Sequence, residues 1–394
     1  MSLLTTQGIR VLQVLVASTI ILTLFFTVSH FGSGALKDSD IINRAKDASS
    51  HFQSSSLNFG GRTPPKPKPA NATLDFQEII YLSMPYRTDR QDALSLIASA
   101  AGLKLTMFPG VSGDAIHEKA RPPLLGGGDN LYDWEHDGKP KPALGIWRAH
   151  ANVWKYMIDN DIQSAFIIED DVDFDVNVKE IMGNFRWQLQ YNNTIRWGED
   201  VEKGWDEECA YGCDWDELFV GQCGGKPNPD RLDLHQFYPD PHSPALSDLA
   251  DWNKKLLTKT WNLTESSNIR VITPTWQPIC LMGYALSRMG AMRLLYHIGG
   301  WRGFGLPVDN EIAMRTAEGV VSGYTLNPPA FTSWRVGGSQ DSDNDAGMLA
   351  QKVNTKGNMD GKSQNLKSSI RTSLAKFFEK SYWKDMEEEV RNVD

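Results

Sequence analysis

A short apolar run followed at once by acidic residues constrains this chain more than any other stretch. Ala165–Ile168 is apolar throughout, which predicts a strand buried on both faces. Five carboxylates follow within seven residues, at Glu169, Asp170, Asp171, Asp173 and Asp175. Ligands bind at the carboxyl ends of parallel strands, and acidic groups gathered there favour a cation such as Mg²⁺ or Mn²⁺. The alternative is a solvated acidic turn that caps the next helix.

The order of the preceding elements places this acidic run at the ligand-binding edge of a sheet. The predicted elements are strand Glu78–Met84, helix Asp89–Ala101, strand Leu103–Phe108, helix Leu144–Asn160 and strand Ser164–Ile168. This alternation predicts an α/β protein with a doubly wound, mostly parallel sheet that binds a nucleotide. Thr88 and Gln91 have the spacing of a capping box, and Gly102 suits the end of the first helix.

The second half of the chain predicts further strands and helices around a long loop. The predicted elements are helices Val178–Leu189, Ser287–Ile298 and Pro307–Ala317, and strands Leu218–Gly221, Ile269–Thr273 and Cys280–Leu286. Residues 228–263 are rich in Pro, Asp and His and predict a long loop with one short helix. Ser287 is expected to cap its helix.

The N-terminal region predicts a membrane anchor. Residues 1–10 form a short polar tail, and residues 11–31 are almost wholly apolar and long enough to cross a bilayer. A cleaved signal peptide, with Gly32–Ala35 as the cleavage region, is the alternative. Residues 32–75 are Pro-rich and predict a stem. The net charge of −9 argues against nucleic-acid binding.

Glycosylation sequons and cysteines favour a lumenal domain. The sequons begin at Asn71, Asn192 and Asn262, and the four cysteines are Cys209, Cys213, Cys223 and Cys280. In an oxidising lumen disulfides are expected rather than zinc ligation, and four cysteines allow three connectivities. The pairing Cys209–Cys213 with Cys223–Cys280 is favoured, because the close pair lies in one loop. Together these features predict a single-pass type II protein of the secretory pathway.

Several separate blocks resemble one enzyme family. The quoted blocks are IIYLSMPYRTDRQDAL, MFPGVSG, LGIWRAHANVWKYMIDNDIQSAFIIEDDVDFD, DWDELFVGQCGG, PICLMGYALSRMGAMRLL, LPVDNEIA and NPPAFTSWR. They are similar to glycosyltransferase family 25, in particular to its fungal-type members. That family includes lipopolysaccharide and procollagen galactosyltransferases. The resemblance covers about residues 78–345, so the transferase domain is expected at 76–345, followed by a mobile segment and C-terminal helix at 346–394.

The resemblance implies a GT-A fold that moves a hexose, commonly galactose, from a UDP-sugar with Mn²⁺ (or Mg²⁺). A divalent cation neutralises the charge that builds on the departing nucleotide. Glu169 and Asp171, or Asp171 and Asp173, have the D-x-D spacing of such metal sites, and strand alternation would point both members of either pair the same way. Asp170 is expected beside them at the nucleotide sugar. The acceptor would be a glycan or glycoprotein in the Golgi or endoplasmic reticulum.

The remaining candidate residues each have a structural alternative. Arg87 and Arg90 follow the first strand and are placed to contact the nucleotide sugar, or they form surface ion pairs with neighbouring aspartates. His150 is either a ligand contact or a core histidine. If the reaction inverts the anomeric centre, Asp309 is the candidate base with Glu311 behind it, although both acids also suit the dipole of a helix start. A non-catalytic, membrane-tethered carbohydrate- or cation-binding protein on the same fold is the alternative function.

Overall fold

The computed structural model describes the part of the chain that carries the predicted transferase domain. The described residues are 66–122, 135–136, 139–140, 142–191, 209–228, 231–263, 268–300, 303, 305–343, 357–358 and 360–379. The predicted tail, the predicted transmembrane stretch at 11–31 and Asn192 lie outside them. Among the described residues, no helix has the length and apolar character that crossing a membrane requires.

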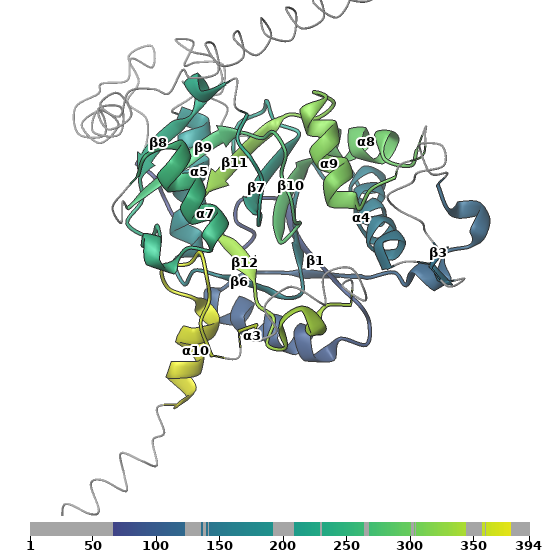
Figure 1. The fold of residues 1–394 in the computed structure, drawn as a ribbon, viewed down its shortest axis with the longest axis horizontal. Helices are drawn as coiled ribbons and strands as arrows, with labels where there is room; N and C mark the ends of the chain where they lie inside the picture. Colours follow the sequence, from purple (N-terminus) through teal and green to yellow (C-terminus); the bar gives the residue numbers. More distant parts are fainter. Residues whose placement is uncertain are drawn as a thin grey trace, which may run out of the picture. The chain divides into compact units, whose positions relative to one another are not determined.

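An eight-stranded sheet forms the centre of the described residues (Figure 1), in the order β2-β1-β5-β10-β7-β11-β9-β8. The strands are β1 (Glu78–Ser83), β2 (Thr106–Pro109), β5 (Ser164–Glu169), β7 (Glu217–Gly221), β8 (Gln236–Pro239), β9 (Ile269–Pro274), β10 (Gly283–Ser287) and β11 (Gly323–Asn327). Only β10 and β9 run antiparallel to both of their neighbours, so the other six strands point the same way. The expected mixed, mostly parallel α/β sheet is therefore present.

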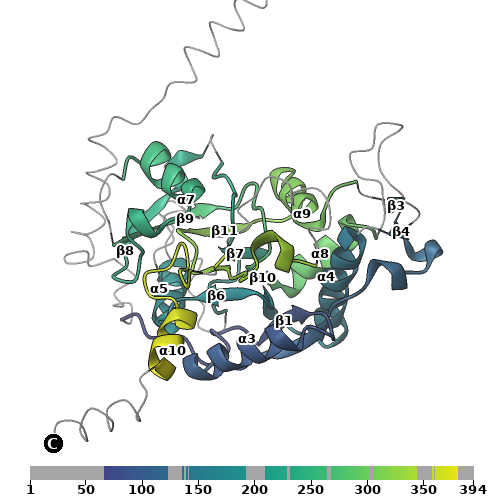
Figure 2. The same cartoon turned by 60° about the horizontal axis from the view of Figure 1, so that its bottom comes forward.

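Helices cover both faces of this sheet (Figure 2). One face carries α3 (Thr88–Ala101), α5 (Val178–Tyr191) and α10 (Ile370–Glu379), and the other carries α4 (Pro142–Asp159), α8 (Arg288–His297) and α9 (Val308–Ala317). Strand residues alternate between the two cores, because successive side chains point to opposite faces. In β5, Phe166 and Ile168 join the first core, whereas Ala165 and Ile167 join the second.

A smaller layer flanks the far end of the sheet. The short helix α7 (Asp251–Lys255) and β8 occupy the segment predicted as a long loop with one short helix. Leu256, Leu257 and Trp261 pack with Val271 of β9 in a separate apolar cluster. The helix was therefore expected and the edge strand was not.

The central strand β11 was not expected either, nor were four short strands outside the main sheet. β6 (Val172–Phe174) directly follows the acidic run and pairs antiparallel with β12 (Phe331–Ser333). This pairing joins residues far apart in the sequence, which no local pattern reveals. A two-stranded ribbon of β3 (Glu135–His136) and β4 (Lys139–Pro140) completes the described strands.

The predicted helix ends are confirmed at two positions and wrong at a third. Gly102 ends α3 with a left-handed φ of 61°, and the Ser287 hydroxyl accepts a hydrogen bond from Gly290 N–H at 3.0 Å. The capping box is wrong: α3 begins at Thr88 itself, and no side chain caps it. Gln91 instead donates to the Ser83 hydroxyl and the Met84 carbonyl at 3.2 and 2.9 Å, so a contact with β1 replaces the local one.

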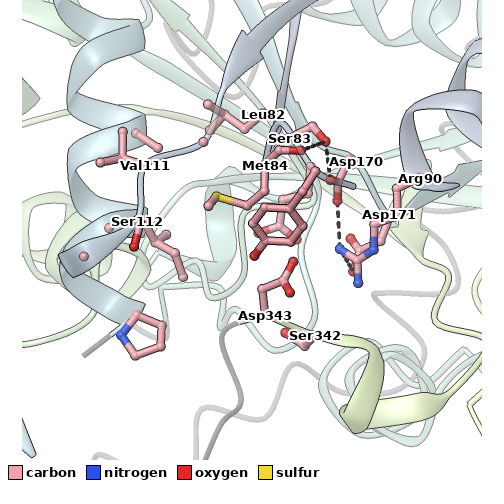
Figure 3. Close-up of a pocket in the computed structure, with 18 of the residues that line it drawn as sticks. Leu82, Ser83, Met84, Arg90, Val111, Ser112, Asp170, Asp171, Ser342 and Asp343 are labelled. Carbon is pink, nitrogen blue, oxygen red and sulfur yellow. Dashed lines mark hydrogen bonds and ion pairs between the residues drawn. The ribbon is translucent and has the colours of Figure 1, made fainter. Parts of the chain in front are cut away.

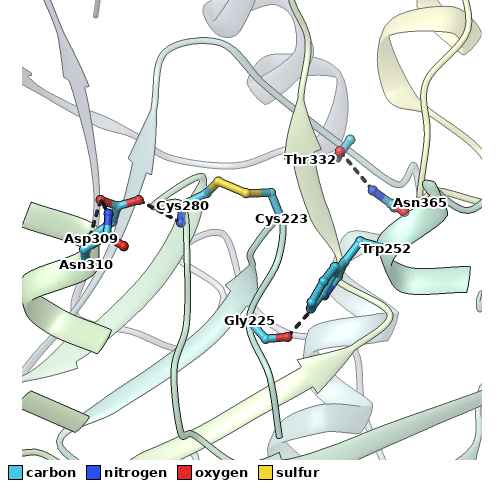
Figure 4. Close-up of a disulfide and its surroundings, with 8 residues drawn as sticks. All are labelled: Cys223, Gly225, Trp252, Cys280, Asp309, Asn310, Thr332 and Asn365. Carbon is cyan, nitrogen blue, oxygen red and sulfur yellow. Dashed lines mark hydrogen bonds between the residues drawn. A yellow bond between two sulfur atoms is a disulfide. The ribbon is translucent and has the colours of Figure 1, made fainter. Parts of the chain in front are cut away.

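Both disulfides have the predicted pairing. Cys209 is bonded to Cys213, and Cys223 to Cys280, with Cα–Cα distances of 5.2 and 5.7 Å. The second bond joins the end of β7 to the segment that leads into β10, close to Asp309 at the start of α9 (Figure 4).

Candidate active site

A cavity of about 250 Å³ opens at the carboxyl ends of β1 and β5 (Figure 3). Its wall is formed by the end of β1, the loop after β2, the first turns of α4, the acidic end of β5 and the segment after β12. The chain passes from β1 to β2 on one side and later to β5 on the other. Such a reversal of strand order is where open α/β sheets bind ligands.

The glycine in α4 allows this wall to form. A Cβ atom on Gly145 would overlap the Val111 carbonyl oxygen and lie 2.8 Å from Gly113 N. The helix backbone therefore lies directly against the loop that follows β2, and both line the cavity.

Asp170 is held by β1 and α3. Its Oδ2 accepts a hydrogen bond from the Ser83 hydroxyl at 2.7 Å, and its Oδ1 forms an ion pair with Arg90 Nη1 at 2.8 Å (Figure 3). Burial raises the pKa of Asp170, while the hydrogen bonds from Ser83 and Arg90 act in the opposite direction. Asp170 thus links the acidic turn to the arginine that follows the first strand.

Asp171 lies in the turn between β5 and β6 with one oxygen paired and the other not. Arg335 Nε donates to Oδ2 at 2.9 Å, and Arg90 Nη1 lies 3.5 Å from the same oxygen. Oδ1 is buried and has no hydrogen-bond partner among the described residues. An unsatisfied buried carboxylate oxygen is costly unless something binds it.

Glu169 faces the same cavity without a protein partner. It is partly exposed, and among the described residues it makes no hydrogen bond or ion pair. Burial, followed by the charge of Asp171, raises the pKa of Glu169 to about 8. Glu169, Asp170 and Asp171 therefore all line the cavity, because Asp170 and Asp171 belong to a turn rather than to an alternating strand.

His150 belongs to the wall and to the core at once. Trp154 Nε1 donates to the Tyr284 hydroxyl at 3.1 Å, and the same hydroxyl is hydrogen-bonded to His150 Nδ1 at 2.8 Å. The ring is buried, and this burial lowers the pKa of His150 to about 3. His150 is accordingly neutral.

Arg87 lies beside the cavity and binds an acidic segment from late in the chain. Its guanidinium contacts the Asp89 carboxylate, the Asp341 carboxylate at 3.0 Å and the Asp343 carboxylate at 3.0 Å. Arg90 Nη2 donates to the Asp341 carbonyl oxygen at 2.5 Å. Acidic side chains thus occupy the two arginines that the sequence suggested for a nucleotide sugar.

Asp173 lies away from the cavity. It is fully buried in β6, where Oδ2 accepts a hydrogen bond from the Ser369 hydroxyl at 2.6 Å and Oδ1 accepts one from Phe174 N–H at 2.9 Å. The assignment of Asp173 as a metal ligand stays a prediction that this placement does not favour.

The two acids of α9 lie outside the cavity lining. Asp309 Oδ2 accepts a hydrogen bond from Cys280 N–H at 3.2 Å (Figure 4), and its charge adds to those of Asp171 and Asp170 in raising the pKa of Glu169. Glu311 is buried and accepts hydrogen bonds from the N–H groups of Gly305 and Leu306 at 3.0 and 3.1 Å. Asp309 is therefore within electrostatic reach of the cavity, whereas Glu311 holds the turn that precedes its helix.

The two sequons that reach the described residues differ in exposure. Asn71 is exposed, and its Oδ1 accepts hydrogen bonds from Thr73 and Asp75 N–H groups. Asn262 is partly buried at the end of the segment after α7. Their glycosylation stays a prediction.

Sequence reasoning missed three contributors to this site. Ser83 ends β1 with a hydroxyl directed at Asp170, and a polar residue at a strand end was the only signal. Asp341 and Asp343 lie near the end of the predicted transferase domain, beyond the last block that resembles the family. Both side chains are negatively charged and complement the positive charges of Arg87 and Arg90. The two pairs are far apart in the sequence, and only the fold brings them together.

The chain was compared with known proteins. Residues 76–312 match the family described as glycosyltransferase family 25 (LPS biosynthesis protein). Procollagen galactosyltransferase 1 of Danio rerio is 24% identical over 195 residues, covering 46% of this chain and 28% of that protein. A glycosyltransferase 25 family member of Drosophila melanogaster is 23% identical over 133 residues, covering 32% of this chain and 21% of that protein. The matches therefore span less than a third of either relative's length.

The family match, in contrast, covers more than half of this chain and includes β1, α4 and the acidic end of β5. The chain belongs to glycosyltransferase family 25.

Proposed function

We propose that this protein is a type II membrane glycosyltransferase that moves a hexose, of the galactose class, from a UDP-sugar to a lumenal glycan or glycoprotein. One observation carries the proposal: Glu169 and Asp171 face a cavity at the switch point of the sheet, with Arg90 beside them. A bound diphosphate is stabilised by positively charged side chains and by a metal ion that acidic side chains hold. This cavity offers Arg90 for the first role and Glu169 and Asp171 for the second.

The residues present fit a divalent cation held by two carboxylates. Among the described residues, no group of three or more His, Cys, Asp and Glu side chains is arranged to hold a metal. Mg²⁺ and similar ions commonly take one or two carboxylates and complete their shell with water and phosphate oxygens. Glu169, which lines the cavity without a hydrogen-bond partner among the described residues, and the unpartnered Oδ1 of Asp171 suit that arrangement. When bound, the cation would neutralise charge on the departing nucleotide.

The surrounding side chains have distinct proposed roles. Arg90 would contact the diphosphate while its pair with Asp170 fixes its position. Neutral His150 would offer Nε2 for a hydrogen bond at the cavity wall. Asp309, oriented by Cys280 N–H, is the proposed base that accepts the acceptor hydroxyl's proton in an inverting transfer. Glu311 is engaged with backbone N–H groups, so we assign it to the support of α9 rather than to proton transfer.

The proposed location rests on the N-terminal sequence and the cysteines. The apolar stretch at 11–31 and the stem at 32–75 favour a single-pass anchor with a lumenal domain. Two disulfides suit an oxidising compartment, and the sequons suit exposure to the glycosylation machinery. We therefore propose the Golgi or the endoplasmic reticulum.

A donor screen tests the proposed activity. Purified protein is incubated with a panel of UDP- and GDP-sugars, with and without Mn²⁺, and release of nucleotide is measured. We expect Mn²⁺-dependent turnover of at least one UDP-hexose, abolished in Asp171→Asn and retained in Asp233→Asn, an exposed acid paired with Arg231 outside the cavity. Absence of turnover across the panel, together with absence of Mn²⁺-dependent nucleotide binding, would contradict the proposal.

A second candidate is a non-catalytic carbohydrate- or cation-binding protein. It is favoured by the mutual pairing of the charged groups, because Asp170, Asp171, Arg87 and Arg90 all have protein partners already. This candidate predicts ligand binding without turnover. Sugar transfer that Asp171→Asn abolishes would exclude it.

A further inference from the structure

The chain beyond the family match packs against the back of the acidic turn. The family match ends at residue 312, whereas Asn365, Leu366, Ser369 and Ile370 are buried against the fold. The helix α10 contacts β6 and α3 (Figure 2), and residues 175 and 369 form a β-bridge. The start of this helix is thus part of the core, while Phe377 and Phe378 near its end are 69% and 63% exposed.

Two residues of this segment bind the main chain and side chain next to Asp171. Arg371 Nε and Nη2 donate to the Val172 carbonyl oxygen at 3.0 and 2.8 Å. The Ser369 hydroxyl donates to Asp173 Oδ2 at 2.6 Å. Burial lowers the pKa of the Arg371 guanidinium, while the charges of Asp173 and Asp171 act in the opposite direction. Arg371 therefore also offsets part of the negative charge of the turn.

A second point of attachment holds Asp171 itself, through its carbonyl oxygen and its carboxylate. Trp334 N–H donates to the Asp171 carbonyl oxygen at 2.6 Å, and the next residue, Arg335, donates to its carboxylate. Asn358 binds the Arg335 backbone twice: its Oδ1 accepts from Arg335 N–H at 2.7 Å, and its N–H donates to the Arg335 carbonyl at 2.8 Å. The Arg371 guanidinium carbon lies 5.9 Å from the Trp334 ring centre, which connects the two attachments.

We propose that Asn358, Ser369 and Arg371 are positioning residues of the donor site. Arg371 and Ser369 hold the chain directly after Asp171, and Asn358 holds the backbone of Arg335, which binds the Asp171 carboxylate, so that this carboxylate keeps its orientation and Oδ1 keeps no protein partner. Residues that orient metal ligands from behind contribute strongly to metal affinity although they never touch the ion. This assignment rests on the proposed function of the cavity, and it makes the segment from 357 to 371 part of the active domain rather than an appended surface helix.

The test measures Mn²⁺-dependent UDP binding to the full chain by titration calorimetry. Arg371→Ala, Ser369→Ala and Asn358→Ala are each expected to weaken that binding roughly tenfold or more. Arg371→Lys, which keeps a donor for the Val172 carbonyl, and Asn358→Asp, which keeps the acceptor oxygen, should each restore part of it. Phe377→Ala, on the exposed end of the same helix, should bind like wild type. Melting temperature is recorded for every variant, and Asn358→Ala and Asn358→Asp carry the test if Arg371→Ala does not fold.

Two results would overturn the assignment in different ways. Wild-type affinity in all three alanine variants, or equal weakening in Phe377→Ala, would refute the positioning role while leaving the proposed function intact. Failure of the wild-type protein to bind UDP with Mn²⁺ would overturn the proposed function and this assignment with it.

Discussion

The acidic segment that occupies Arg87 and Arg90 leads to a prediction about donor affinity. Asp341 Oδ1 lies 3.0 Å from Arg87 Nη2 and 3.8 Å from Nη2 of Arg90, the arginine proposed to contact a diphosphate. A bound diphosphate would compete with this carboxylate for the same guanidinium groups. Asp341→Asn keeps the side-chain shape and the backbone carbonyl contacts but removes the competing charge.

The expected change in UDP affinity follows from the solvent exposure of the Arg87–Asp341 ion pair. The Arg87 side chain is 12% exposed and that of Asp341 is 27% exposed, so solvent screens the interaction. A partly shielded ion pair of this kind contributes about 1 kcal/mol. Removing it should therefore tighten UDP binding by about fivefold.

Titration calorimetry with UDP and saturating Mn²⁺ measures this effect. The Kd of Asp341→Asn should fall about fivefold relative to wild type, and the difference should shrink at high salt, which screens the competing charge. Asp233→Asn, at an exposed pair outside the cavity, is the matched control and should leave the Kd unchanged. Unchanged or weaker UDP binding in Asp341→Asn would refute the competition.

Three further predictions concern the stability of the fold that carries the site. Gly145→Ala should lower the unfolding free energy by about 1–3 kcal/mol and weaken UDP binding, because its Cβ overlaps the Val111 carbonyl; chemical denaturation and calorimetry measure both. Burial raises the pKa of Glu217 to about 8, so the folded chain keeps a proton that the unfolded chain loses above about pH 4.5. Stability should therefore fall as pH rises from 4.5 to 8, and Glu217→Gln should flatten that fall in urea titrations across this range. Replacing Cys223 and Cys280 by Ser should cost about 4 kcal/mol of unfolding free energy, because the bond closes a loop with a sequence separation of 57.

Each of these predictions has an internal control. Gly224→Ala adds a methyl group where no atom lies within 4 Å, so equal destabilisation there would contradict the packing argument for Gly145. A Glu217→Gln variant whose stability falls with pH as steeply as wild type would show that another group carries the proton. Removing the Cys209–Cys213 bond, with a sequence separation of 4, should cost about 2 kcal/mol less than removing the long-range bond.

The sequence predicted those features that depend on local signals. The apolar run at Ala165–Ile168, the left-handed Gly102 and the capping Ser287 each act within a few residues of themselves. Their elements therefore appear close to the expected positions, and the first strands, β1, β2 and β5, are parallel as expected. The capping box predicted at Thr88 was wrong because the contact that replaces it is not local: the Gln91 side chain donates to Ser83 of β1.

The site was predictable only in part. The position of the acidic run at the sheet edge follows from the order of elements, but the direction of each carboxylate does not. Strand alternation would point Asp171 and Asp173 the same way. Asp171 instead lies in a turn, whereas Asp173 lies in β6 and accepts a hydrogen bond from Ser369, nearly two hundred residues away in the sequence. The contacts of Arg335 and Asp341 are equally long-range, and no local pattern specifies them.

Locating a bound metal ion and nucleotide would show whether the acidic end of β5 forms the donor site. Crystals of the protein grown with UDP and Mn²⁺ allow the ion to be located from its anomalous scattering. The account predicts an anomalous peak within coordination distance of Glu169 and Asp171, with the diphosphate between that ion and Arg90. An ion bound elsewhere, or a diphosphate that contacts neither Arg90 nor the acidic turn, would contradict it.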